Sequence, residues 1–164
     1  MKINLFLCVI FLAGCTAEKN GESSPKKTSG QNNIAVDNVQ NHANVHCEKD
    51  ICLQLRNYNK EKKSFDIYLL NSVPVAGFQC DFPGINIIGS DGGLLKENEY
   101  QTSNSASRIL SFSMQAKLIP VGEGILTTIL FSESIDEICM TEIIFAGIGG
   151  NQLSSNSPEC LKLN

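Results

Sequence analysis

The sequence of 164 residues contains no tryptophan and only two histidines, His42 and His46, which both precede residue 47. Aromatic residues make up 7% of the chain. Histidine is the side chain that enzymes most often use as a general base, and sugar-binding surfaces usually rely on exposed aromatic rings. These shortages count against a histidine-dependent active site and weaken the case for a sugar-binding surface. The two histidines have the i, i+4 spacing of a metal pair on a helix, but their Asn-rich surroundings favour solvated side chains.

The sequence also lacks an apolar run long enough to cross a bilayer, which takes roughly 20 residues in a helix. Near the start, Lys2 is followed by the apolar stretch 5–13, and the small residues Ala13 and Gly14 directly precede Cys15. A positive residue, a short apolar run and small residues are typical of an export signal that is removed. We therefore expect residues 1–14 to be a signal peptide.

The end of this signal carries a more specific pattern. The four residues Leu12-Ala13-Gly14-Cys15 directly follow the apolar run and resemble the lipobox of bacterial lipoproteins. The resemblance implies cleavage before Cys15 and attachment of lipid to its thiol, so that the membrane is a partner through this anchor. It further implies a location at the cell envelope, facing the periplasm or the cell exterior. The alternative is an ordinary signal peptide followed by an unrelated cysteine.

Residues 15–45 are expected to be the lipidated cysteine and a flexible tether. Residues 16–45 are rich in Asn, Ser, Lys, Gln and Gly and contain no aromatic residue. Such a composition buries too little apolar surface to offset the entropy lost on ordering. The remaining residues, 46–164, are expected to form one domain.

The charge of the chain argues against nucleic acid as a partner. The formal net charge is −4, and acidic residues outnumber basic ones within 46–164. Proteins that bind nucleic acid concentrate Lys and Arg on one face. The one basic cluster, Lys60, Lys62 and Lys63, surrounds Glu61 in a predicted turn and is interpreted as a solvated loop.

Five cysteines remain after Cys8 leaves with the signal and Cys15 takes lipid. An exported protein enters an oxidising compartment, where disulfides persist. The sequence favours one bridge at the start of the domain, one between its last strands, and a buried free thiol; other pairings stay open. In that order these are Cys47 with Cys52, Cys139 with Cys160, and Cys80. Paired C-x2-C spacing is absent, so we expect no zinc site and no cofactor.

The domain reads as all-β. Short β-rich runs alternate with turn residues about every ten positions, which is the pattern of a sandwich. The stretch 125–132 is apolar on both faces and is predicted to be a central strand, whereas 94–100 is predicted to form one helical turn. Breaks are expected at 59–62, 90–93 and 120–124. The predicted strands cover 51–57, 64–71, 75–82, 85–88, 108–114, 125–132, 140–146 and 159–163.

Four segments of the domain resemble cohesin-like domains of bacterial surface proteins. They are Val73-Pro74-Val75-Ala76-Gly77-Phe78-Gln79-Cys80-Asp81-Phe82, Ile109-Leu110-Ser111-Phe112-Ser113, and Ile119 to Leu126 with its proline-glycine turn, followed by Ile138-Cys139-Met140-Thr141. The resemblance covers roughly residues 51–163. Cys80 departs from it, because the family strand usually has an aromatic residue there.

The resemblance implies a jelly-roll β-sandwich of about eight or nine strands, related to carbohydrate-binding modules. Well-known members of the family bind dockerin modules through one sheet face. We therefore expect a non-catalytic module that binds a protein. The first alternative is a carbohydrate-binding module, with Tyr68 and Tyr100 as possible contacts; the second is a glycosidase that uses two carboxylates, although no pair stands out from the spacing.

Calcium is a further alternative, because it takes six to eight oxygen ligands. Asp81, Asp91, Glu97 and Glu99 can supply such oxygens, but 91–93 lacks the alternating acidic positions of an EF-hand loop. We expect carboxylates on loops and no bound metal.

Overall fold

The computed structural model describes residues 47–132 and 135–163, which form a predominantly β domain. Its elements follow one another in the order β1 (Ile51–Asn59), β2 (Ser64–Asn71), β3 (Gly77–Asp81), β4 (Ile87–Asp91), α1 (Gly93–Glu97), β5 (Gln101–Asn104), β6 (Arg108–Phe112), β7 (Gly122–Phe131), β8 (Glu137–Ile138), β9 (Thr141–Ala146), η1 (Ile148–Gly150), β10 (Gln152–Leu153) and β11 (Leu161–Lys162).

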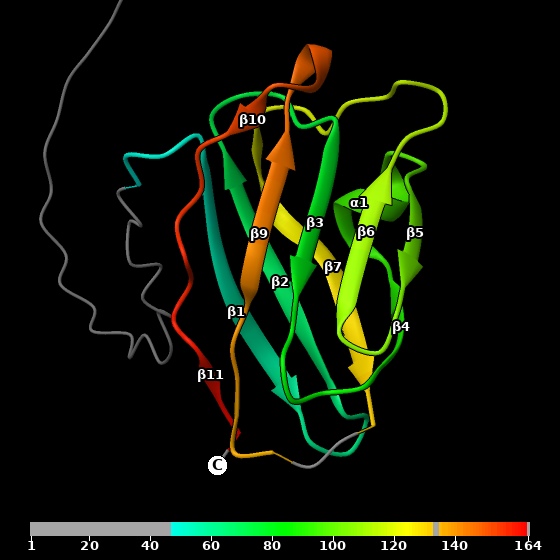
Figure 1. Ribbon diagram of the computed structural model, residues 1–164, viewed down its shortest axis with the longest axis vertical. Helices are drawn as coiled ribbons and strands as arrows, with labels where there is room; N and C mark the ends of the chain where they lie inside the picture. Colours follow the sequence, from blue (N-terminus) through cyan, green and yellow to red (C-terminus); the bar gives the residue numbers. More distant parts are fainter. Residues whose placement is uncertain (1–46, 133–134, 164) are drawn as a thin grey trace, which may run out of the picture. The chain divides into compact units, whose positions relative to one another are not determined.

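The strands form two facing antiparallel sheets (Figure 1). One sheet has the order β1-β2-β7-β4, and the other has the order β10-β9-β3-β6-β5. β8 and β11 pair separately. Because consecutive strands repeatedly pass from one sheet to the other, the predicted jelly-roll β-sandwich is confirmed.

The core lies between the two sheets and follows from the alternation of side chains along each strand. In β2, Phe65, Ile67 and Leu69 are fully buried, and they alternate with less buried residues. The ring of Phe65 lies 5.3 Å from that of Phe82, in an edge-on arrangement that aromatic pairs favour. The strand itself coincides with the one predicted over 64–71.

β7 is a central strand, as its apolar character on both faces predicted, because it pairs with β2 and β4. The break expected at 120–124 is wrong in part. Gly122 to Gly124 lie inside β7 and pair with Asn71 to Leu69 of β2. The glycine at position 124 leaves room for Leu94, whose side chain lies 3.5 Å from where a Cβ would be placed.

The break expected at 90–93 is also shifted. Ser90 and Asp91 belong to β4, and the chain turns only at Gly92 and Gly93, which have φ values of 77° and 64°. A Cβ on Gly93 would collide with the carbonyl of Ile125, so glycine is required where α1 meets β7. The helical turn predicted over 94–100 is α1, which begins one residue earlier and ends three residues earlier than expected.

The segment that follows β10 runs along the open edge of β1 and then pairs with β8 (Figure 1). The backbone N–H of Ile51 donates to Ser154, and the side-chain amide of Asn156 bonds both backbone groups of Leu53. These contacts satisfy polar groups of an edge strand that water or another chain would otherwise meet.

Two disulfides tie the ends of this arrangement, and they are the pairs that the sequence favoured. Cys47 is bonded to Cys52, with Cα atoms 6.1 Å apart, and Cys139 is bonded to Cys160, with Cα atoms 4.4 Å apart. Cys80 is a buried free thiol, and burial raises its pKa well above the ordinary value.

Three short strands were missed by sequence reasoning: β5, β8 and β10. The predicted strand 159–163 shrinks to β11, and 85–88 shifts to Ile87–Asp91. Strands of two residues leave no periodicity in a sequence, so tertiary pairing alone defines them. In the described ranges, no helix is long and apolar enough to cross a membrane.

Candidate functional site

The outer face of the five-stranded sheet is unexpectedly apolar. In β6, Ile109 and Ser111 point into the core, whereas Leu110 and Phe112 point outward with exposed fractions of 41% and 39%. The inward hydroxyl of Ser111 is satisfied at 2.8 Å by that of Thr102. A strand with one face in water usually alternates apolar inside and polar outside, and β6 departs from this order at Leu110, Ser111 and Phe112.

The neighbouring strands extend this apolar surface. Gly77 of β3 pairs with Phe112 on one side and with Ala146 of β9 on the other. Two residues along, Gln79 lies between Leu110 and Ile144, which is 42% exposed. We call the resulting two rows the sheet patch; its members are Gly77, Gln79, Leu110, Phe112, Ile144 and Ala146.

The centre of the sheet patch is low. Gly77 has no side chain, and a Cβ placed there would meet its nearest neighbours, the Ser111 carbonyl and Ala146, only at ordinary contact distances of 3.6 and 3.8 Å. The space above Gly77 is therefore open because glycine has no side chain, and a Cβ would fit there without a clash. Phe112 and Ala146 flank it on the strands that Figure 1 shows next to β3, and Ile144 follows in the next row.

A charged pair borders the sheet patch at its far end. Arg108 of β6 donates two hydrogen bonds to Asp81 of β3, at 2.5 and 2.7 Å. These bonds hold the pKa of Asp81 below its ordinary value and raise that of Arg108. An apolar centre with a polar border is the usual composition of a protein-binding surface.

The two tyrosines that sequence reasoning offered as sugar contacts do not form such a surface. Tyr100 is buried, and its hydroxyl donates to the carbonyls of Val75 and Lys117, so this prediction is wrong. Tyr68 lies on the four-stranded sheet, where the guanidinium of Arg56 covers its ring 3.7 Å from the centroid. A sugar stacking on that face of the ring would have to displace the arginine.

Three of the four carboxylates considered for calcium, Asp81, Asp91 and Glu99, are paired with cations. Asp81 binds Arg108, and Asp91 lies 2.8 Å from Lys96. Glu99 lies 2.6 Å from Lys117 across another part of the surface. A carboxylate engaged by a cation is a poor calcium ligand, because the bond must be broken first.

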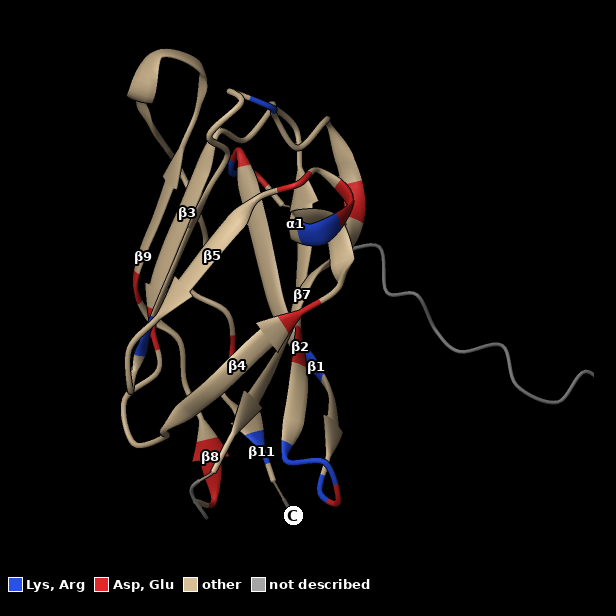
Figure 2. Cartoon of the chain, turned by 90° about the vertical axis from the view of Figure 1, so that its right-hand side faces the viewer, with Lys and Arg blue, Asp and Glu red and all other residues tan. Residues whose placement is uncertain are grey.

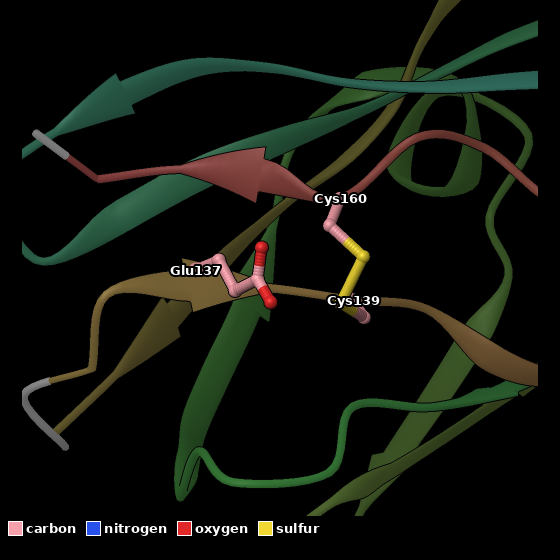
Figure 3. A group of neighbouring side chains, drawn as sticks. All are labelled: Glu137, Cys139 and Cys160. Carbon is pink, nitrogen blue, oxygen red and sulfur yellow. A yellow bond between two sulfur atoms is a disulfide. The ribbon is translucent and has the colours of Figure 1, made fainter.

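One other group has the spacing of a metal site, namely Glu137, Cys139 and Cys160, whose ligand atoms lie within 4.8 Å of one another. Figure 3 shows the two sulfur atoms bonded to each other beside the Glu137 carboxylate. Metal ions bind thiolates, and neither sulfur of a disulfide is a thiolate. The group is thus a structural bridge between β8 and β11. It is the one such cluster within 47–132 and 135–163.

The remaining predicted site residues lie elsewhere. Cys15, His42 and His46 fall outside the described residues. The turn with Lys60, Lys62 and its neighbours is exposed, as expected of a solvated loop.

Sequence reasoning missed the apolar members of the sheet patch. Leu110, Phe112 and Ile144 fall in the predicted strands 108–114 and 140–146, and the sequence did not show which side of these strands faces water. The one unusual feature of the sequence here is that Ser111 and Ser113 lie on the same side of the predicted strand as Ile109, which leaves the other side wholly apolar from Leu110 to Met114.

Comparison with known proteins gives distant matches. No protein-family model and no curated protein sequence matches the chain. Among solved structures, it is similar to a non-cellulosomal cohesin from the hyperthermophilic archaeon Archaeoglobus fulgidus, with 12% identity and a TM-score of 0.47; the match covers 68% of this chain and 87% of the other.

A second similar structure is a chain of the CaDoc0917–CaCohA2 complex, with 10% identity and a TM-score of 0.46. That match covers 70% of this chain and 99% of the other. Both similarities are too distant to assign this chain to a family or to a binding partner.

Proposed function

We propose that this chain is a non-catalytic binding module that holds a protein partner through the sheet patch, at a membrane to which Cys15 is attached by lipid. The observation that carries the first half is the outward apolar row of β6 and β9. Leu110, Phe112 and Ile144 are each about two-fifths exposed on regular, hydrogen-bonded strands. Keeping them in water costs free energy that covering them by a partner would recover.

The shape of the sheet patch favours a protein as its occupant. Its strands are fixed by pairing on both sides of β3, so little ordering entropy is lost when a partner binds. The polar border at Arg108 and Asp81 gives a partner directional hydrogen bonds beside the apolar centre. A buried centre of large apolar side chains is where binding energy usually concentrates.

Polysaccharide is the weaker alternative. Of the two tyrosines proposed as contacts, Tyr100 is buried and Tyr68 is covered by Arg56. Phe112 is the one aromatic ring of the sheet patch, and sugar stacking generally uses several coplanar rings.

The proposal of membrane attachment rests on the lipobox-like sequence that ends at Cys15. Two or more acyl chains make anchoring stable, whereas a single chain binds reversibly. A binding module on such an anchor would hold its partner at the surface of the envelope.

A capture experiment tests the proposed function. Residues 15–164 with Cys15→Ser are immobilised and exposed to solubilised envelope from the producing cell, in parallel with a glycan array. A saturable protein that is retained supports the proposal. Binding to glycans without any protein would favour the alternative, and turnover of an envelope substrate would contradict both.

A further inference from the structure

One end of the sandwich carries three exposed aliphatic side chains on loops. Met114 and Val121 lie in the connection from β6 to β7, and Ile148 begins η1. Their exposed fractions are 65%, 56% and 65%. None of the three belongs to the sheet patch, and the core does not use them.

The strand register places these loops together. β6 ends at Phe112 and β9 ends at Ala146, and both residues are partners of Gly77. β7 begins at Gly122, opposite the last residue of β2. All three strands therefore have these ends on the same side of the molecule, which is the upper side in Figure 1.

The loops are folded, so their side chains are held outward. The hydroxyl of Ser113 accepts hydrogen bonds from the backbone N–H groups of Gln115 and Lys117, at 3.3 and 3.1 Å. In the other loop, the N–H of Gly147 donates to the carbonyl of Asn151 at 2.8 Å. A loop backbone held by such hydrogen bonds keeps its aliphatic side chain exposed to solvent.

The loops that carry the three aliphatic side chains contain little charge of their own, although Glu48, Lys49, Asp50 and Glu123 lie at the same end. The connections 72–76, 113–121 and 147–151 contain one charged residue, Lys117. At the opposite end, the turn 60–63 consists entirely of charged residues. In Figure 2 the upper loops are largely tan, with charged segments beside them around α1, and some of the lower turns are blue or red.

The chain enters the domain at the same end. Ile51, the first residue of β1, lies opposite Asn71, which in turn lies opposite Gly122. Residues 16–46 connect Cys15 to this end of the domain. The end with the exposed aliphatic residues is therefore within reach of a bilayer that holds Cys15.

We propose that the loops with Met114, Val121 and Ile148 rest in the interfacial region of the lipid bilayer; this inference relies on the membrane attachment in the proposed function. The contact is apolar, because the domain is acidic and gains nothing from anionic headgroups. The strands then point away from the bilayer, and the sheet patch on their side stays open to a partner.

The test supplies the anchor chemically, so that it does not depend on lipidation in the cell. The chain 15–164 is coupled through the Cys15 thiol to a maleimide lipid in phosphatidylcholine vesicles. Cys80 is buried and the other cysteines are in disulfides, so Cys15 is the reactive thiol. Hydrogen exchange is then compared with that of the same chain, blocked at Cys15, mixed with the vesicles.

We expect amides in 114–121 and 148–150 to exchange several-fold more slowly in the coupled protein, with no change in the turn 60–63. The triple substitution Met114→Ser, Val121→Ser and Ile148→Ser should remove this protection. Ile88→Ser is the matched control, since Ile88 is 60% exposed on β4, whose first residue pairs with the far end of β7. Circular dichroism shows whether each variant is folded.

Three outcomes would overturn the inference. Unprotected loops in the coupled protein would do so, as would protection that survives the triple substitution. Loss of partner capture by the triple variant, at unchanged protection, would assign the loops to the protein interface instead. Failure of capture by the unsubstituted protein would count against the sheet-patch proposal alone.

Discussion

Tyr100 is a residue whose hydroxyl joins two segments of the fold. The hydroxyl lies 2.7 Å from the carbonyl of Val75 and 3.1 Å from that of Lys117, and burial raises the pKa of the side chain. It thereby links the chain entering β3 to the loop after β6. The ring that sequence reasoning assigned to sugar is a structural one.

Replacing Tyr100 with Phe should lower the free energy of unfolding by about 1–3 kcal/mol, because two carbonyls lose a buried donor. Urea denaturation measures the loss. Tyr68→Phe is the control. Tyr68 is a half-buried residue of β2, and we expect its substitution to change the free energy of unfolding by less than about 0.5 kcal/mol. Equal effects of the two substitutions would show that the buried hydroxyl contributes nothing of its own.

At the scale of elements, the segment from Ser154 to Leu163 fastens both sheets. It leaves β10, bonds the edge of β1 through Ser154 and Asn156, and ends on β8. The Cys139–Cys160 disulfide closes this path. Sequence reasoning favoured the bridge but did not foresee the segment it holds.

Removing that bridge with Cys139→Ala and Cys160→Ala should lower the free energy of unfolding by about 3 kcal/mol in the chain-entropy model. The Cys47–Cys52 bridge closes a shorter loop, with a sequence separation of 5 residues against 21. Removing it with Cys47→Ala and Cys52→Ala should therefore lower the free energy of unfolding by about 1 kcal/mol less. Denaturant titration compares the two. A larger loss from the shorter loop would contradict the entropic explanation.

The contact between Asp50 and Ser154 should make the same segment sensitive to acid. The Asp50 carboxylate accepts from the backbone N–H and the hydroxyl of Ser154, at 2.9 and 2.7 Å, and these bonds lower its pKa. Because the folded pKa lies below the unfolded one, the stabilisation is complete above the unfolded pKa. It is lost as pH falls through the folded value.

The stability difference between wild type and Asp50→Asn should therefore be constant above about pH 5 and disappear toward about pH 2. Denaturation midpoints measured over this pH range test the expectation. A difference that grows as pH falls would contradict it.

The strands show how far a sequence predicts a fold of this kind. β2 and β7 were predicted within a few residues because their apolar periodicity is long and strong. β8 and β10 have two residues each, and only their partners define them. The sheet patch was missed for a related reason: which face of β6 is buried depends on how the opposite sheet packs against it, and local alternation does not specify that packing.

At the scale of the whole molecule, we propose a lipid anchor at Cys15 that is joined to a domain with a binding face, the sheet patch. The anchor is tested by Cys15→Ser followed by fractionation of the cells. We expect the wild type to sediment with membranes and the variant to be released from them, because the substitution removes the thiol to which we propose the lipid is attached. A variant that still sediments with membranes would require another means of attachment.

The most direct test of the central claim is the affinity of the captured partner for a domain with an altered sheet patch. Phe112→Asp combined with Ile144→Asp places two charges at its centre, while Ile88→Asp combined with Ile125→Asp does the same on the four-stranded sheet, where both side chains are exposed. We predict that the first pair weakens binding about 100-fold or more, as substitution of central interface residues does, and that the second leaves it within about threefold. Unchanged binding by the first pair, or equal loss in both, would contradict the assignment of the partner to the sheet patch.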